Sequence, residues 1–156
     1  MKRGAREGRR VDAERCGEGC LCLQIRRAAR LVTQLYDEEV RQSGLSMAQF
    51  GLLAGLRRMG DTTQRELAEQ MTLDPTTLTR NVAPLIRRGY VRKVQRGADR
   101  RERRLELTAE GAAQLRAAGR HWQRAQDRVR ETLGPGAWSD LHRLLGQMLN
   151  GTARLT

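Results

Sequence analysis

The residues between Thr63 and Thr108 constrain the fold more than any other part of the chain. Thr63 and Glu66 have the spacing of a capping box, in which each side chain accepts a hydrogen bond from the other residue's backbone N–H at the start of a helix. Asp74 and Pro75 mark a second helix start, because aspartate accepts from the first free amides and proline needs no N–H at the first helical position. The sequence therefore predicts two short helices joined by a tight turn.

A basic hairpin is predicted to follow the second helix. Gly89 ends that helix, and the chain then runs outward, turns around Gly97-Ala98-Asp99 and returns to Thr108. Two half-buried strands have their apolar positions at Val91, Val94, Leu105 and Leu107. The basic residues of the hairpin are Arg92, Lys93, Arg96, Arg100, Arg101, Arg103 and Arg104, and Asp99 and Glu102 lie among them. This layout is typical of a winged helix-turn-helix DNA-binding domain, and arginine at a hairpin tip suits the narrow, electronegative minor groove.

The second of the two helices is predicted to be the recognition helix. Leu78, Val82 and Leu85 fall at i, i+4 and i+7 and form one apolar stripe for the core. Hydroxyls and an arginine near the helix start can contact phosphates and base edges in a major groove, although an ordinary amphipathic helix would also present a solvated polar face. Pro84 removes an intrahelical hydrogen bond, so we expect the last turn to bend and the groove contacts to end at Arg80. The candidate DNA-binding residues are Thr76, Thr77, Thr79 and Arg80 on this helix and Arg96, Asp99, Arg100 and Arg101 on the hairpin.

Four segments resemble a known family. They are Arg65-Glu66-Leu67-Ala68, then Thr76-Thr77-Leu78-Thr79-Arg80, then Leu85-Ile86-Arg87-Arg88-Gly89-Tyr90-Val91, and finally Asp99-Arg100-Arg101 followed by Leu105-Glu106-Leu107-Thr108-Ala109-Glu110-Gly111. Over about residues 22 to 150 the chain is similar to the multiple-antibiotic-resistance regulator (MarR) family of bacterial transcription factors.

The resemblance implies a homodimer that binds double-stranded, pseudo-palindromic operator DNA with its recognition helices in successive major grooves. It also implies that Asp99 braces the wing by pairing with an arginine and that Arg101 enters the minor groove. The fold class expected is α+β and mostly helical, a winged helix-turn-helix domain with a helical dimerisation layer.

The remainder of the chain is predicted to supply that layer. We expect a disordered basic arm over 1–15, a helical dimerisation layer over 16–45 and 109–156, and the DNA-binding domain over 46–108. A helix from Leu21 should end near Ser43-Gly44, and Ser46 and Gln49 form another capping box. A break is expected at Gly134-Pro135-Gly136. Two apolar stripes in the layer are predicted to need a partner helix: Leu115, Ala118, Trp122, Ala125 and Val129 in one, and Trp138, Leu141, Leu145 and Met148 in the other.

The charge of the chain points to a polyanionic partner. Its 30 basic and 18 acidic residues give a formal net charge of +12, and the aromatic content of 3% offers little for RNA-type base stacking. No apolar run approaches the ~20 residues that a membrane span needs, and no apolar core of a signal peptide follows the basic start. We therefore expect no membrane partner and a cytoplasmic location.

Three cysteines, Cys16, Cys20 and Cys22, lie together at the junction of the basic arm and the first predicted helix. An odd number of thiols in a reducing compartment argues against structural disulfides. Three thiolates suit a trigonal site for As(III) or Sb(III), whereas tetrahedral zinc would need a fourth ligand from Glu18, His121, His142 or a second subunit. Reversible disulfide formation is the rival sensing chemistry, and thiols without a function are the remaining alternative.

No catalytic site is predicted, and no cofactor is certain. His121 and His142 stand alone on helices, without the second histidine or carboxylate of a metal motif, and no glycine-rich phosphate loop or nucleophile elbow is present. The sequence predicts a transcriptional repressor released by a thiol-reactive metalloid, metal or oxidant. The alternatives are release by an organic, phenolic-type ligand, a cysteine-based metal carrier or thiol redox enzyme, and a non-specific architectural DNA-binding protein.

Overall fold

The computed structural model describes residues 19–95 and 103–152. The predicted basic arm, Cys16 and the hairpin-tip residues Arg96, Asp99, Arg100 and Arg101 lie outside these residues, so those predictions stand as they were made. The chain divides into two compact units, Met1–Gln34 and Leu35–Thr156. Helix α2 (Leu21–Val40) runs through the boundary between them.

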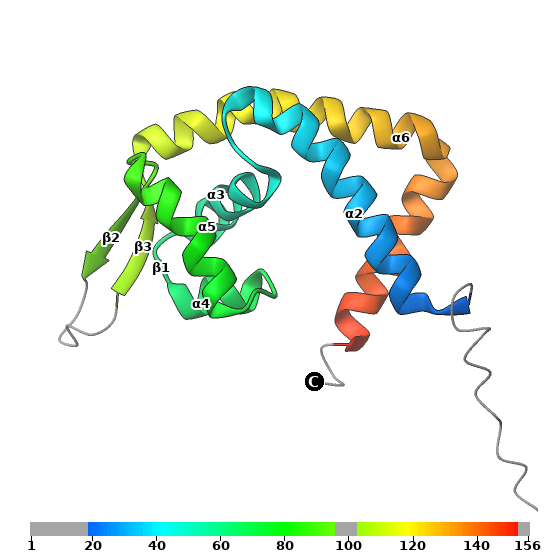
Figure 1. Ribbon diagram of the computed structural model, residues 1–156, viewed down its shortest axis with the longest axis horizontal. Coiled ribbons are helices and arrows are strands. Elements are labelled where there is room, and N and C mark those ends of the chain that lie inside the picture. The colour runs from blue at the N-terminus through cyan, green and yellow to red at the C-terminus, as the bar shows by residue number, and fades with distance from the viewer. Residues whose placement is uncertain (1–18, 96–102, 153–156) are drawn as a thin grey trace, which may run out of the picture. The chain divides into compact units, whose positions relative to one another are not determined.

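The second unit contains the DNA-binding domain predicted from the sequence (Figure 1). After α2 come a 3-10 turn, η2 (Arg41–Ser43), and the helices α3 (Met47–Met59), α4 (Gln64–Gln70) and α5 (Pro75–Arg87). Strands β1 (Thr62–Thr63), β2 (Val91–Gln95) and β3 (Arg103–Leu107) form one antiparallel sheet in the order β1-β3-β2. The long α6 (Ala109–Thr152) follows. This is the mostly helical α+β winged helix-turn-helix fold that the sequence predicted.

The helix starts form by the local chemistry that the sequence indicated. Ser46 Oγ accepts from Gln49 N at 3.2 Å, and Gln49 Oε1 accepts from Ser46 N at 3.1 Å. Likewise, Thr63 Oγ1 accepts from Glu66 N at 3.1 Å, and Glu66 Oε2 accepts from Thr63 N at 2.8 Å. Asp74 accepts a hydrogen bond from the backbone N–H of Thr77 at 2.9 Å. These side chains satisfy amides that no helical carbonyl can reach, and so they determine where α3, α4 and α5 begin.

The hairpin is joined to α6 by an unusually close contact at Gly111. A Cβ atom at this position would lie 2.1 Å from the backbone oxygen of Tyr90, so only glycine fits. Thr108 caps α6 by accepting from Gly111 N at 3.0 Å, and its hydroxyl donates to the Gly89 carbonyl at 2.7 Å. The end of β3 and the start of α6 are therefore fixed against the residues that follow α5.

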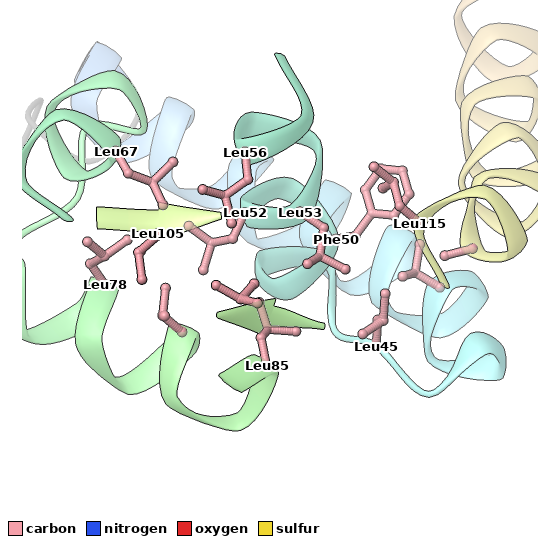
Figure 2. Packing of buried hydrophobic residues seen from close by; sticks show 14 of the residues in the cluster. Leu45, Phe50, Leu52, Leu53, Leu56, Leu67, Leu78, Leu85, Leu105 and Leu115 are labelled. Atoms are coloured by element: carbon pink, nitrogen blue, oxygen red, sulfur yellow. The ribbon is translucent and has the colours of Figure 1, made fainter. Parts of the chain in front are cut away.

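The hydrophobic core surrounds α3 (Figure 2). On α3, Leu52, Leu53 and Leu56 are fully buried, and side chains from α4, α5 and the sheet pack around them. Those side chains are Leu67, Leu78, Val82, Leu85, Val91 and Leu105. The stripe predicted for the recognition helix is thus confirmed, with Leu78, Val82 and Leu85 each at most 1% exposed.

The first half of α6 also belongs to this core, so the partner helix that its apolar stripe was predicted to need is α3. Leu115 and Ala118 are buried in the cluster around α3, and Trp122 stacks on Phe50 with ring centroids 6.1 Å apart. These side chains therefore have their partners in the same chain and do not await a helix of a second subunit. Heptad-like spacing shows that a helix has an apolar seam, but it carries no information about which chain supplies the opposite side.

The second half of α6 differs from the first. Gly134 has φ 74° and ψ 163°, so the helix is kinked at the predicted break. Beyond it, Leu144 and Leu149 are 51% and 67% exposed, and Leu141 and Leu145 are also exposed. Among the described residues, no helix is long and apolar enough to cross a membrane.

Candidate nucleic-acid interface

Helix α5 is held at its start by Asp74 and continues unbroken through Pro84 to Arg87. Hydrogen bonds from the side chain and then the backbone of Thr77 lower the pKa of the Asp74 carboxyl, so it is a charged cap. Because α5 continues past Pro84, the face that carries Arg80 extends for a further turn of helix. Loss of a single hydrogen bond at Pro84 is offset by the packing of Val82 and Leu85 in the core.

The outward face of α5 is built from residues at i, i+4, i+7 and i+11: Thr76, Arg80, Ala83 and Arg87. At 100° per residue, all four lie within about 40° of the direction opposite Leu78. Thr76, Arg80 and Arg87 are exposed, and Ala83 is half-buried. Neither Arg80 nor Arg87 forms an ion pair with another described residue. The face therefore presents two arginines whose donors are available to an external acceptor.

The four candidates predicted on α5 separate into two pairs. Thr76 and Arg80 lie on the outward face, and their side chains form no hydrogen bond with another described residue. The Thr77 hydroxyl hydrogen-bonds to the Asp74 cap, and that of Thr79 donates to the Pro75 carbonyl at 2.8 Å. Thr77 and Thr79 are therefore engaged in the first turn of α5, and only their remaining lone pairs could accept from DNA.

Sequence reasoning missed Ala83 and Arg87 as members of this face. The signal was present, because the spacing that joins Thr76 to Arg80 continues to both residues. The bend expected at Pro84 excluded both residues from the candidate DNA contacts.

The hairpin uses some of its basic residues for its own structure. Arg92 pairs with Glu106 across the strands, Nη2 to Oε2 at 2.9 Å. On β3, the Arg104 Nε donates to Asp61 Oδ1 at 2.8 Å, and its Nη2 donates to the Asp61 carbonyl at 3.0 Å. Lys93 is exposed and forms no ion pair with another described residue.

Arg104 connects the wing to the start of α4. Its Nη2 lies 3.8 Å from Glu66 Oε2, the atom that accepts from the Thr63 N–H and the Thr62 hydroxyl. The backbone hydrogen bond from Thr63 is the largest cause that lowers the pKa of Glu66, and Arg104 contributes a smaller part. One half-buried guanidinium thus fixes the base of the hairpin relative to the helix-turn-helix.

Two of the three cysteines lie at the first turn of α2. The Cys20 carbonyl accepts from Gln24 N at 3.1 Å, the first helical bond, and Cys22 follows two residues later. Cys20 is half-exposed, Cys22 is exposed, and both are free thiols. No group of three metal-binding side chains occurs within the described residues. His142 Nδ1 lies 3.0 Å from the Trp138 carbonyl of its own helix.

A groove of about 450 Å³ lies between α3 and the first half of α6. Its apolar wall contains Phe50 and Leu115, and its basic residues are Arg57, Arg58 and Arg116. None of these three arginines forms an ion pair with another described residue. The groove therefore combines an apolar surface with unpaired positive charge.

Comparison with known proteins supports the class that this geometry suggests. The sequence model of the MarR family matches residues 45–102. The HTH-type transcriptional regulator YwoH of Bacillus subtilis is 34% identical over 87 residues, which cover 56% of this chain and 63% of YwoH. The matched segment thus spans less than two thirds of that relative.

Solved structures extend the similarity over most of the chain. The crystal structure of the M. tuberculosis transcriptional regulator MosR has 36% identity and a TM-score of 0.75, covering 89% of this chain and 98% of MosR. MosR in complex with DNA gives 38% identity and a TM-score of 0.75, covering 87% and 98%. A MarR variant from E. coli, solved with operator DNA, has 25% identity and a TM-score of 0.75. The match covers 83% of this chain and 93% of the MarR chain. The chain belongs to the MarR family of transcriptional regulators.

Proposed function

We propose that this protein is a homodimeric, sequence-specific repressor that binds a pseudo-palindromic operator in the cytoplasm. The outward face of α5 carries the proposal, because Arg80 and Arg87 are exposed and pair with no other described residue, on a helix of the size that a major groove admits. The hairpin would place Arg101 in the adjacent minor groove, with Asp99 bracing the wing. MosR and MarR, which share this fold, have been solved with DNA.

Exposed apolar side chains support the homodimer. In the second unit, Leu141, Leu144, Leu145 and Leu149 are exposed beyond the kink of α6. In the first unit, the exposed side chains of α2 are Leu21, Leu23, Leu31 and Val32. Monomeric proteins rarely expose apolar groups in such number on neighbouring turns, so burial against a second copy is the explanation we favour. A dimer of this kind would separate its recognition helices by about 34 Å, one turn of DNA.

A binding experiment at controlled salt tests the proposal against its alternatives. Purified protein is incubated with genomic fragments at about 150 mM salt, and the retained DNA is sequenced. A repressor retains a small set of fragments that share an inverted repeat. Uniform retention would instead indicate the architectural role that the net charge of +12 could support, and no retention would favour the cysteine-based carrier.

For the signal that releases DNA, we propose a thiol-reactive effector at Cys16, Cys20 and Cys22. Support comes from the accessibility of Cys20 and Cys22 and from their position on the helix that leads into the DNA-binding domain. Three thiols can replace the three hydroxyl groups of arsenous acid with release of three waters. Alternatively, peroxide can oxidise two thiols to a disulfide and is itself reduced to water.

The groove between α3 and α6 favours a second candidate signal, a small organic anion such as a phenolic carboxylate. Its volume of about 450 Å³ lies in the range of ligand pockets, and Arg57, Arg58 and Arg116 could pair with the anionic group. This candidate needs no cysteine.

One titration separates the two signals. Operator release is measured with arsenite, antimonite, zinc, peroxide and salicylate, for the wild type, single Cys→Ser variants and Arg116→Ala. Thiol sensing predicts that a metalloid, metal or oxidant releases DNA and that Cys→Ser variants resist it. Release by salicylate alone, lost in Arg116→Ala, would replace the thiol proposal with the organic ligand.

A further inference from the structure

Between Arg80 and Arg87 on α5 lies an apolar step, made of Ala83 on the outward face and Pro84 beside it. Ala83 lies three residues after Arg80, and Pro84 lies three residues before Arg87. Both are half-buried, and no charged side chain of α5 lies between them and the two arginines. The step exists only because α5 remains helical through Pro84 to Arg87.

Neither residue can form a hydrogen bond to a base edge. The Ala83 side chain is a methyl group, and Pro84 has a hydrocarbon ring and no backbone N–H. In the major groove, the base edges present hydrogen-bond donors and acceptors with one apolar exception, the C5-methyl group of thymine. An apolar surface on a major-groove helix is therefore complementary to the methyl group of thymine and offers no partner to the donors and acceptors of the base edges.

The dimensions of the helix and of DNA place that thymine close to the base pair contacted by Arg80. Residues 80 and 83 are separated by about 4.5 Å along the helix axis, at 1.5 Å per residue. Base pairs are about 3.4 Å apart. The two contacts are therefore one or two base pairs apart.

The small size of Ala83 favours direct contact. A long side chain at this position would hold the helix away from the floor of the groove, whereas a methyl group permits the backbone to approach. The nearby Thr79 hydroxyl is bonded to the Pro75 carbonyl at 2.8 Å, so it does not offer a competing donor at this step.

We propose that Ala83 and Pro84 bind a thymine methyl group, so that each operator half-site contains a thymine one or two base pairs from the base pair that Arg80 contacts. This inference rests on the proposed DNA-binding function and adds to it a chemical requirement on the DNA. The recognised group is a single methyl, which can be removed from the DNA without changing any hydrogen bond.

Deoxyuridine substitution provides the test. An operator is first obtained from the retained fragments, and each thymine of one half-site is replaced in turn by deoxyuridine. At one thymine we expect the affinity to fall about threefold to fourfold, the loss expected when one methyl group is no longer buried. The remaining thymines should change the affinity little.

A variant at position 83 assigns the effect to this step. In Ala83→Ser a hydroxyl replaces the apolar surface. The same deoxyuridine substitution should therefore lower the DNA affinity of this variant by less than twofold. Ala117→Ser makes the same change at an exposed position on α6 and should keep the wild-type sensitivity to deoxyuridine. Circular dichroism of both variants checks that the helices are intact.

The outcomes distinguish this inference from the function on which it rests. If no operator can be selected, the proposed function fails and this inference with it. If an operator is bound selectively but no thymine responds to deoxyuridine, only this inference is overturned. The same holds if Ala83→Ser remains as sensitive to the missing methyl as the wild type.

Discussion

The guanidinium of Arg88, the residue that caps the C-terminus of α5, donates a hydrogen bond from Nη1 to the carbonyl oxygen of Gly44 at 2.6 Å. Gly44 has φ 80° and follows η2, at the corner between α2 and α3. Gln114 of α6 donates to the neighbouring carbonyl of Ser43 at 2.5 Å. The end of the recognition helix is thus bonded to the corner at which α2 ends.

The other side of this corner is held by α2 itself. Asp37 accepts from the Met47 N–H at 2.6 Å, so the last turn of α2 caps the start of α3. A change in the last turn of α2 would therefore act on the Gly44 carbonyl, which is bonded to α5. The proposed effector acts at the other end of α2, which is joined to this corner through the 20 residues of the helix.

Arg88 and Arg87 should have separable roles. Arg88→Ala removes the bond to Gly44 and should lower the free energy of unfolding by about 1 kcal/mol. Arg87→Ala, one residue earlier, removes a side chain with no partner among the described residues and should leave stability within about 0.5 kcal/mol while weakening operator binding. Urea unfolding and fluorescence anisotropy with labelled DNA measure the two effects. Equal loss of stability in both variants would contradict this assignment.

Gly111 should tolerate no side chain. Gly111→Ala places a Cβ 2.1 Å from the Tyr90 carbonyl oxygen, and moving the hairpin away from α6 should cost about 1–3 kcal/mol. Gly119→Ala is the matched control on the same helix, because a Cβ there meets nothing within 4 Å. That change should be neutral or stabilising, since alanine is the better helix former. A thermal unfolding temperature of Gly111→Ala equal to or above that of the wild type would show that the contact between Gly111 and Tyr90 is not rigid.

Glu66 should make stability depend on pH in the acid range. Its pKa is lowered below the ordinary value of 4.5, first by the backbone hydrogen bond from Thr63 and then by the Thr62 and Thr63 side chains. Because the folded-state pKa is depressed, the stabilisation is complete above about pH 4.5 and is lost as the pH falls through the lowered value.

Glu66→Gln is the matched variant for this effect. Glutamine can still accept in a capping box but does not titrate. Urea midpoints measured between pH 6 and pH 3 should therefore fall less steeply for the variant than for the wild type. Parallel curves would mean that another carboxylate dominates acid unfolding.

The wing should contribute through charge. Arg101→Ala should weaken operator binding and reduce the slope of log affinity against log salt by about 0.9 per subunit, since one phosphate-region cation is lost. Asp99→Ala should loosen the wing without changing the preferred sequence. Titrations between about 50 and 200 mM salt measure the slope. A slope unchanged by Arg101→Ala would remove this arginine from the DNA contact.

Local chemistry explains why much of the fold could be predicted. The caps at Ser46, Thr63 and Asp74 each depend on residues three apart, and the kink at Gly134 depends on one residue and its proline neighbour. Such features are visible in any sequence because the interacting groups are close along the chain.

Contacts between distant residues could not be predicted in the same way. Arg88 with Gly44, and Arg104 with Asp61, join residues about 40 positions apart and leave no periodic signal. For the same reason, Leu115 and Trp122 could be recognised as apolar seam residues but not assigned to the core of their own chain. At the candidate site, the outward face of α5 was predicted as far as Arg80. Ala83 and Arg87 were left out because a bend was expected at Pro84.

The central claim is that α5 recognises DNA sequence through its outward face. It is tested most directly by measuring, at one salt concentration, the affinities of the wild type, Arg80→Ala and Arg120→Ala for a selected operator and for a scrambled duplex of equal length. Arg120 is an exposed arginine on α6 and controls for the loss of one charge. We predict that the wild type prefers the operator at least about 10³-fold and that Arg80→Ala loses about 1–3 kcal/mol on the operator alone, with Arg120→Ala close to wild type. Equal affinity of the wild type for both duplexes, or an Arg80→Ala variant that binds the operator as tightly as the wild type, would contradict the account.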